Sequence, residues 1–414
     1  MLTPLLPIPP RRALYFCLLL ALFELLTYIA SDVVMPAMLN VTRDLAAGPQ
    51  HIPYALNAYL LGGVALQWLI GPLSDRFGRR PMLLIGCAGF TVTCIASYWV
   101  DNIHLFNGLR LLQGIGLGFV VVVSYPALQE AFAETDAVRL MAMLANIALL
   151  SPLLGPLLGS VLLEWISWRT LFLLIGICGA LTWVSLYCYM PETLGVTRRD
   201  GSRLDKQPLA LASVAASYRS LLRNRRFLAG SAALGLIGLP LIAWIGLAPL
   251  LLVKGAGLST MTYGLWQLPV FGGLITGNLL LNHLAERYSL ESLAGRSLWA
   301  LLGGLLLGAA ATWLWPSVPA LVAGLTLYTV GLGICNATLY RLTLFSSDAS
   351  KGVVSAMLGM ISVAILGLGG SVLAACGAGN GLTDFAIAAC ATGLLALWPL
   401  RHILRPQSAQ AQYA

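Results

Sequence analysis

Twelve apolar runs, each about as long as a bilayer-spanning helix, occupy most of this sequence and limit what it can fold into. A helix needs about 20 mainly apolar residues to cross the hydrocarbon core of a membrane. We therefore predict an all-α integral membrane protein with twelve transmembrane helices. The runs cover residues 14–38, 52–73, 82–100, 103–126, 140–163, 170–190, 228–253, 262–284, 297–315, 318–340, 352–375 and 383–404.

The composition excludes a soluble enzyme. Charged residues make up 10% of the chain, whereas soluble domains carry about 25%. The sequence also contains neither a phosphate-binding GxxxxGK[ST] loop nor an HExxH motif, which disfavours a membrane-bound enzyme. The eight cysteines lie in or beside apolar runs without CxxC or His-rich spacing, so the sequence predicts no disulfide framework, no metal site and no cofactor.

The positions of the basic residues predict how the chain is oriented. Of the 24 lysines and arginines, 20 lie on one side of the membrane if both termini are cytoplasmic. Arg43, Arg169 and Lys254 lie on the other side, and Arg110 lies within a run. Because basic loops resist translocation, we predict that both termini are cytoplasmic. The net charge of +8 then faces an anionic lipid leaflet, and no nucleic-acid partner is expected.

The longest polar stretch, Pro191 to Arg226, divides the runs into two sets of six. We predict an N-terminal six-span bundle at residues 1–190, a cytoplasmic linker at 191–227 and a C-terminal six-span bundle at 228–414. Residues 209–222 have the pattern of a short surface helix, and the alternative, which the sequence favours, is a linker that only tethers the two halves. LSDRFG (residues 73–78) and LAERYS (284–289) follow the second and eighth runs, which indicates two pseudo-symmetric halves.

Two acidic residues, Glu24 and Asp32, lie well inside the first run. A charge within a span is costly, so each is a candidate functional group. Eight positions along a helix correspond to about 12 Å of rise and about 80° of rotation, so both side chains can face one cavity. Desolvation there opposes ionisation, which favours proton exchange near neutral pH, and the carboxylates would also attract cations. The alternative is a pair of polar groups satisfied by neighbouring helices.

Arg110 is the basic residue placed inside a span, the fourth. Counted from the outer face, Arg110 and Asp32 are both roughly 10 Å deep, so they could form an ion pair if the two spans are neighbours. Gln113, one turn further on, extends the polar patch. We predict that Arg110 and Gln113 take part in proton coupling together with the two acids; a purely structural Arg110 is the alternative.

Two motifs rich in glycine and proline predict the gating elements. In GPLSDRFGRRP (71–81), Asp75 has the charge to cap the N-terminus of the eleventh span, near Lys351 and Gly352. SPLLGPLLG (151–159) has a small-xxx-small face that permits close helix approach and a bend. Membrane orientation and simple packing are the alternatives. The predicted gating residues are Gly71, Asp75, Arg76, Gly78, Arg79, Pro152, Gly155, Pro156 and Gly159.

These motifs together resemble the major facilitator superfamily. GPLSDRFGRRP is similar to its signature between spans two and three, RLLQG (110–114) to its proton-linked motif, and SPLLGPLLG to its antiporter motif. FELLTYIASDVVMP (23–36) and YRLTLFSSDASKGVVSAMLGM (340–360) resemble the MdfA/MdtM multidrug–proton antiporters within that family. The resemblance extends from about Tyr15 to Leu404.

The resemblance implies a proton-coupled multidrug efflux antiporter in the bacterial inner membrane. It would export lipophilic cationic and neutral drugs by alternating access, as a monomer, with the proton as the coupling ion and no cofactor. Ser31 stands where the nearest family members often have Asn, so the substrate preference is expected to differ. The implied substrate-binding residues are Glu24, Tyr28, Asp32, Leu56, Asn146, Leu149, Leu241, Ile242 and Ile245.

Two rival functions within the same architecture stay open. A proton-coupled symporter of small molecules is the nearest, but its substrate would need several converging polar groups, whereas the candidate cavity residues are mostly apolar. A channel is disfavoured because the second set of six spans contains no buried acid. Flux driven by an imposed pH gradient separates an antiporter from an enzyme and from a channel.

Overall fold

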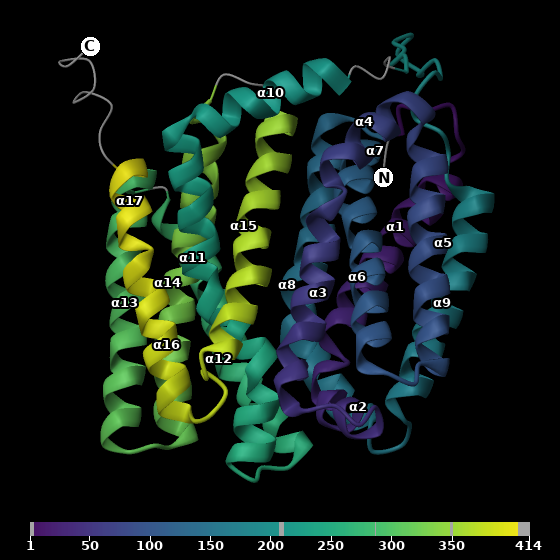
Figure 1. The fold of residues 1–414 in the computed structure, drawn as a ribbon. Helices are drawn as coiled ribbons and strands as arrows, with labels where there is room; N and C mark the ends of the chain where they lie inside the picture. The colour runs from purple at the N-terminus through teal and green to yellow at the C-terminus, as the bar shows by residue number, and fades with distance from the viewer. Residues whose placement is uncertain (1–3, 207–210, 286, 348–350, 405–414) are drawn as a thin grey trace, which may run out of the picture. The chain divides into compact units, whose positions relative to one another are not determined.

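The computed structural model describes residues 4–206, 211–285, 287–347 and 351–404, and for a few helical positions it describes the backbone alone. Within these ranges all the secondary-structure elements are helices (Figure 1). Two isolated β-bridges also occur, Pro4 with Phe132 and Thr197 with Arg203. The chain divides into two compact units. Unit 1 is Met1–His51 with Ala58–Ala212, and unit 2 is Ile52–Asn57 with Ser213–Ala414.

Unit 1 contains the helices of the first six predicted spans. The helix α1 packs against α8 and α9, and α5 packs against α6 and α9. The α-helices are α1 (Pro10–Asp32), α2 (Met38–Asp44), α3 (Ile52–Ala65, which begins in unit 2), α4 (Gln67–Phe77), α5 (Arg79–Ala96), α6 (Ile103–Phe119), α7 (Tyr125–Ala131), α8 (Glu134–Leu162) and α9 (Trp168–Tyr189). Short 3-10 helices lie at η1 (Met35–Ala37), η2 (Pro49–His51) and η3 (Ser97–Trp99).

Two of these spans are broken at defined points. The helices α3 and α4 meet at Leu66 with a bend of 42°. Between α6 and α7 the chain forms a π-helix, η4 (Val120–Ser124), and Pro126 follows in the first turn of α7. A π-helical turn inserts an extra residue and rotates the side chains that follow it. Tyr125 is the first residue of the helix that follows this turn.

Unit 2 contains the helices of the last six predicted spans. In this unit α14 packs on α12 and α13, and α11 packs on α15. Its elements are α10 (Leu211–Arg223), α11 (Arg225–Ala248), the π-helix η5 (Pro249–Gly255), α12 (Thr260–Leu284), α13 (Leu290–Leu314), α14 (Val318–Leu344), α15 (Lys351–Ala375), α16 (Leu382–Leu395) and α17 (Leu397–Ile403). Glu286, part of the LAERYS segment, lies outside the described residues.

The observed helices confirm the predicted twelve-helix membrane architecture. Ten helical segments of the described chain are long and apolar enough to cross a membrane, and the bent pair α3–α4 makes an eleventh. The remaining predicted run, 140–163, lies within α8 except for its last residue, and the part Leu150–Leu162 is an apolar helix but a shorter one. Large apolar side chains stay exposed on the helices, for example Leu181 on α9 (65%) and Trp299 on α13 (84%). Such faces suit lipid rather than water, so the chain is a multi-pass membrane protein.

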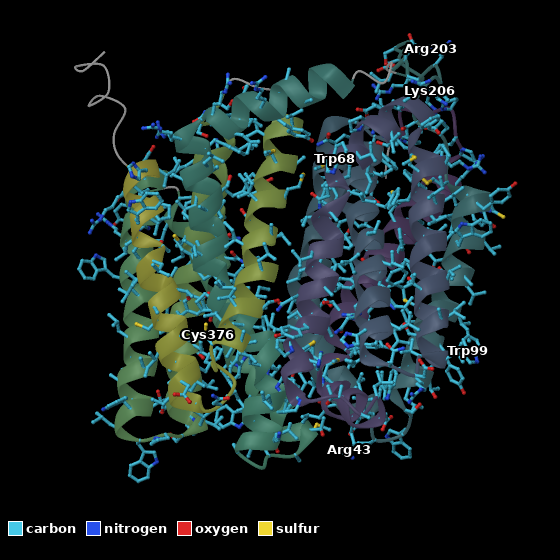
Figure 2. The ribbon with its side chains drawn as sticks, viewed as in Figure 1. Arg43, Trp68, Trp99, Arg203, Lys206 and Cys376 are labelled. Carbon is cyan, nitrogen blue, oxygen red and sulfur yellow. The ribbon has the colours of Figure 1, made fainter. Side chains whose placement is uncertain are left out.

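The predicted linker has two structurally different parts. Residues 194–206 have no helix and attach to the first residues of unit 1: the Arg199 backbone N–H donates to Leu5 O at 2.7 Å and its Nη2 donates to Ile8 O at 2.8 Å. The second part is α10, where the sequence predicted a short helix at 209–222. Arg203 and Lys206 lie at one end of unit 1 and Arg43 at the other (Figure 2), as opposite membrane faces require.

Candidate functional site

The first candidate group, Glu24, lies in the middle of α1 and is fully buried. One carboxylate oxygen, Oε1, accepts a hydrogen bond from the Tyr125 hydroxyl at 3.2 Å. The other, Oε2, has no hydrogen-bond partner among the described residues. A buried carboxylate with an unsatisfied oxygen is costly unless it binds a proton or a cation. Glu24 is therefore chemically suited to exchange one for the other.

The second acid, Asp32, ends α1 and is held by α8. Its Oδ2 accepts a hydrogen bond from Ser151 Oγ at 2.8 Å, and the side chain is buried. The predicted close approach at SPLLGPLLG is present here. A Cβ added to Gly155 would lie 2.6 Å from Asp32 Cβ, and one added to Gly159 would collide with Val33 O. Pro152 and Pro156 lie inside α8 beside these glycines.

Arg110, on α6, is fully buried and joins α6 to α1. Its Nη1 donates to Ala30 O and to Gln113 Oε1, each at 2.9 Å. Gln113 Nε2 in turn donates to Ser97 Oγ at 2.9 Å. The side chain thus extends a polar chain from η3 to the backbone of α1, as the predicted polar patch requires.

The predicted ion pair between Arg110 and Asp32 is absent from the described part of the chain. The guanidinium binds the carbonyl two residues before Asp32, and its Nε and Nη2 have no hydrogen-bond partner there. The rings of Tyr59 and Phe172 lie 4.6 Å and 5.8 Å from its central carbon instead. The sequence placed Arg110 and Asp32 at similar depths, and Arg110 does bind the end of α1. Which atoms of the two helices meet also depends on how each helix is rotated about its axis, and depth does not give that rotation. Cation–π contact takes the place of the ion pair.

The predicted substrate pocket draws on both units. In unit 1, Tyr28 is half-buried on α1 and lies four residues from each acid, so all three side chains share one face. Leu56, Leu241 and Ile245 are buried and Ile242 is half-buried, all in unit 2. The side chains of Asn146 and Leu149 lie outside the described residues. A pocket that combines these residues remains a prediction.

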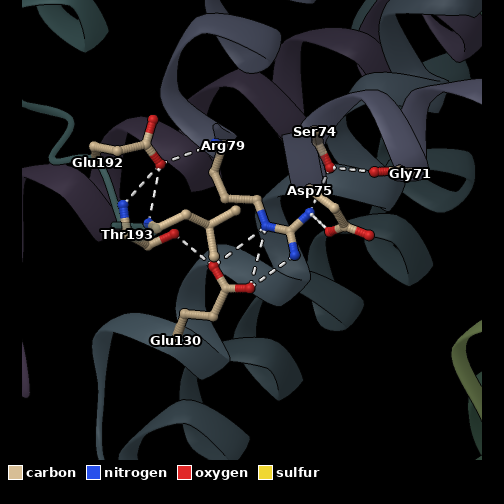
Figure 3. Close-up of polar contacts among 8 residues, drawn as sticks. Gly71, Ser74, Asp75, Arg79, Glu130, Glu192 and Thr193 are labelled. Carbon is tan, nitrogen blue, oxygen red and sulfur yellow. Dashed lines mark hydrogen bonds and ion pairs between the residues drawn. The ribbon is translucent and has the colours of Figure 1, made fainter. Parts of the chain in front are cut away.

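The turn between α4 and α5 contains a second polar cluster, centred on the buried side chain of Arg79 (Figure 3). Arg79 Nη1 pairs with Asp75 Oδ1 at 2.6 Å and also bonds Ser74 Oγ. Its Nη2 pairs with Glu130 Oε1 at 2.8 Å, which ties α5 to α7. Ser74 Oγ donates to Gly71 O at 2.9 Å. Arg76 points outward, 5.6 Å from the exposed ring of Phe77.

Asp75 therefore has a partner within unit 1 that the sequence did not predict. Its carboxylate is 44% exposed, so one oxygen can pair with Arg79 while the other stays accessible. The predicted contact to the N-terminus of the eleventh span, near Lys351 and Gly352, would join a residue of unit 1 to a helix of unit 2. That contact remains a prediction.

The start of the predicted linker binds this same turn through Glu192. Glu192 Oε1 accepts hydrogen bonds from the backbone N–H groups of Arg79 (3.0 Å), Thr193 (2.9 Å) and Leu194 (3.2 Å). Gly78 has φ +114°, and a Cβ there would collide with the Glu192 carboxylate. Since Arg79 is the first residue of α5, Glu192 places a negative charge on a helix N-terminus. The linker thereby fixes the α4–α5 turn.

Replacing Glu192 by Ala is expected to lower the free energy of unfolding by about 1 to 2 kcal/mol. The charge on the α5 N-terminus is lost, and three backbone donors lose their acceptor. Thermal unfolding of the purified variant in detergent measures the change. Glu164→Ala, which removes an exposed acid, is the matched control and should leave the transition unchanged. Equal unfolding of the two variants would mean that Glu192 contributes no stability.

Sequence reasoning missed three residues that contact Glu24, Asp32 or Arg110. Ser151 opens a motif that was noticed only for its glycines and prolines, whereas Tyr125 and Tyr59 lie in mainly apolar runs and carry no charge. Tyr59 OH also donates to Thr27 O at 2.5 Å, which fixes its ring over Arg110. Hydroxyl groups are common in spans, so only the fold reveals which of them meets an acid. Glu130 and Glu192, which bind the turn between α4 and α5, were also missed, because both lie near the ends of spans, where acidic residues are common.

Comparison with known proteins places the chain in a family. Residues 20–374 match the family model of the Major Facilitator Superfamily. The multidrug transporter MdfA of Yersinia pestis is 46% identical over 365 residues, which cover 87% of this chain and 86% of that protein. The MdfA proteins of Edwardsiella ictaluri and Escherichia coli O157:H7 are 45% and 44% identical over the same coverage.

Solved structures share the fold at low sequence identity. A D-xylose-proton symporter superposes with a TM-score of 0.74 at 17% identity, covering 94% of this chain and 97% of that one. The human organic anion transporter MFSD10 gives a TM-score of 0.65 at 19% identity, covering 95% and 100% of the two chains. With the family match and the MdfA relatives, these findings show that the chain belongs to the Major Facilitator Superfamily, a family of transporters rather than enzymes.

Proposed function

We propose that this chain is a proton-coupled multidrug efflux antiporter that exports lipophilic cationic and neutral drugs by alternating access. The observation that carries the proposal is Glu24, a fully buried carboxylate with one oxygen unpaired among the described residues. The MdfA relatives, named as multidrug transporters, support the substrate class. The remaining parts of the proposal are a bacterial inner membrane location, cytoplasmic termini, a functional monomer and no cofactor.

Competition between drug and proton for the face of α1 would provide the coupling. A deprotonated Glu24 or Asp32 attracts a cationic drug, and a protonated one does not, so proton capture from outside releases the drug. Coupling requires this differential affinity, because a ligand that binds every state equally shifts nothing. Tyr28 lies between the two acids and offers an aromatic face to a lipophilic cation.

Arg110 and Ser151 would position the two acids rather than exchange protons themselves. Ser151 donates to Asp32, which limits the directions from which a cation can approach that carboxylate. Arg110 holds the carbonyl of Ala30 and thereby the end of α1. An arginine keeps its own proton at physiological pH, so its contribution is a fixed positive charge beside the exchanging groups.

Two measurements on the whole purified protein test the proposal. Addition of tetraphenylphosphonium, a lipophilic cation, to protein in weakly buffered detergent should release protons. In proteoliposomes, a pH gradient should drive accumulation of the same cation against its own gradient, in the direction opposite to proton flow. Cation and proton movement in the same direction would identify a symporter, and cation flux without proton movement would refute coupling.

Asp75→Asn is expected to populate the inward-open state and to slow turnover several-fold, with drug affinity from the cytoplasmic side kept or improved. The predicted contact of the Asp75 carboxylate with the N-terminus of the eleventh span would contribute about 0.3 to 2 kcal/mol. Its loss shifts a near-balanced equilibrium between the inward-open and outward-open states without changing the drug site. Spin-label distances across the ends of the second and eleventh spans report the shift.

The local ion pair with Arg79 supplies the control for this prediction. Glu130→Gln removes one of the two ion pairs of Arg79 but leaves Asp75 charged. This variant should therefore lower the free energy of unfolding without opening the cytoplasmic side. If Asp75→Asn and Glu130→Gln give the same spin-label distances as the parent, Asp75 serves only the α4–α5 turn.

A further inference from the structure

Two histidines with no role in the proposed transport cycle lie in ring contact at the starts of α3 and α6. His51 ends η2 and precedes α3, and His104 is the second residue of α6. Their ring centroids are 5.9 Å apart and the ring planes are perpendicular. The chain has four histidines, so half of them meet at one point. Because they are 53 positions apart in the sequence, spacing alone predicted no metal site.

The backbone beneath both rings is fixed. Pro49 opens η2, and Pro53 occupies the first turn of α3, so proline limits the dihedral angle φ on both sides of His51. At the other helix, the side chain of Asn102 accepts a hydrogen bond from Leu105 N–H at 2.8 Å and caps α6. The two rings therefore project from ordered helix starts, which lowers the entropic cost of binding a shared ligand.

A third polar group lies at the same level of these helices. The helices α3 and α6 are in backbone contact: a Cβ at Gly114 would collide with Tyr59 O, and one at Gly118 would lie 2.7 Å from Gly63 O. Asn107 lies three residues after His104 on α6, so the two side chains share one face of that helix. Asn107 Oδ1 is buried and has no hydrogen-bond partner among the described residues.

We propose that His51 and His104 bind a divalent transition-metal ion, with Asn107 Oδ1 as an additional oxygen ligand. Zn–N bonds of about 2.0–2.1 Å place the centroids of two imidazoles on one tetrahedral ion about 5 to 6 Å apart, and the observed separation is 5.9 Å. Imidazole ligands suit zinc, copper and nickel, whereas magnesium and calcium prefer oxygen ligands.

The site is expected to bind a metal ion more weakly than a structural metal centre does. The described residues contain no group of three or more His, Cys, Asp or Glu side chains around one point, so water completes the coordination. Each helix N-terminus opposes a cation, at a cost of less than about tenfold in affinity. Binding is therefore reversible, as a regulatory site requires.

The position of the metal site gives binding a consequence for transport. Arg110 lies six residues after His104 on α6, about 9 Å along the helix axis, and Tyr59 of α3 covers its guanidinium. An ion that joins His51 to His104 ties together the two helices that enclose Arg110 and restrains their relative movement. Metal binding then inhibits transport. The binding stands on the histidine geometry alone, whereas the inhibition rests on the proposed function.

Copper is the sharpest probe, because Cu²⁺ binds nitrogen ligands more tightly than the other divalent ions of its series. Cu²⁺ is titrated into the purified full-length protein, prepared without a histidine tag and with the exposed cysteines alkylated. Electron paramagnetic resonance should show one ion with nitrogen ligands. His51→Ala and His104→Ala should each weaken binding at least about tenfold, and His51→Gln serves if the alanine variant does not fold.

The other two histidines provide matched controls. His283→Ala and His402→Ala remove exposed imidazoles from α12 and α17, so they should bind copper as the parent does. Equal affinity in the parent and in both His51 and His104 variants, or absence of nitrogen ligation in the parent, overturns the metal site.

Transport in proteoliposomes tests separately whether the metal site exists and whether metal binding inhibits transport. Zn²⁺ should inhibit tetraphenylphosphonium transport by the parent, and His104→Ala should relieve the inhibition. Copper binding at the two histidines with transport unaffected by Zn²⁺ refutes the inhibition and keeps the site. Copper binding by a parent protein that transports no cation refutes the proposed function instead.

Discussion

Replacing both acids of α1 by their amides, Glu24→Gln with Asp32→Asn, is expected to reduce proton-coupled transport of a monovalent cation to the level of empty vesicles. In the described part of unit 1 these are the acids buried within the membrane-spanning part of a helix, so the double variant has no titratable carboxylate on that face. The amides keep the size of each side chain and its capacity to accept from Tyr125 and Ser151. Uptake of tetraphenylphosphonium in proteoliposomes with an imposed pH gradient measures the loss.

The single variants and two exposed acids complete the comparison. Either single amide is expected to keep partial activity toward neutral drugs, because one carboxylate remains on α1. Glu164→Gln and Asp384→Asn remove exposed acids from the two units and should transport as the parent does. Full proton-coupled transport of the cation by the double amide would refute the role of α1 in coupling.

Gly159→Ala is expected to destabilise the protein by about 1 to 3 kcal/mol, the range for overpacked cores, and to lower transport with it. The added Cβ would collide with Val33 O, a backbone atom that cannot turn aside, and would approach Pro36. The helices α1 and α8 must then separate next to Asp32. Thermal unfolding in detergent and cation uptake measure the two effects.

Gly89→Ala is the control for this substitution, because the same change from glycine to alanine is expected to leave stability unchanged or to raise it. Gly89 lies within α5 and an added Cβ there meets nothing within 4 Å. Alanine favours a helix interior over glycine by about 0.5 to 1 kcal/mol, so this variant should be as stable as the parent or more so. If both variants unfold alike, the contact between α1 and α8 tolerates the extra methyl group.

The sequence predicted the helices and the charged groups well because both follow from local rules. An apolar run of sufficient length predicts a span wherever it occurs, and a charge within such a run is rare enough to identify a site. Glu24, Asp32 and Arg110 were found in this way, and the structure buries all three. Gln113 was found by its position one turn after Arg110, and its Oε1 accepts a hydrogen bond from Arg110.

The partners of these groups depend on tertiary structure and were not predictable. The run VVVVS gives no sign that it forms a π-helix, yet this turn precedes Tyr125 and its bond to Glu24. Arg110 was matched to Asp32 by depth alone, and the fold directs it to Ala30 O and to the ring of Tyr59. Glu192 was counted as part of a linker, although it binds the first N–H group of α5.

The two units differ in the residues that they bury. Within its described residues, unit 2 buries no acidic side chain, and its buried polar contacts are neutral, such as the bond from Trp244 Nε1 to Gln267 Oε1 at 2.8 Å. On the proposed function, the proton-exchanging groups lie in unit 1, so unit 2 is not constrained by energy conversion. Substitutions in α11 that reshape an apolar surface leave the proton-exchanging carboxylates intact. The spectrum of exported compounds can therefore drift under antibiotic selection without loss of the ability to use the proton gradient.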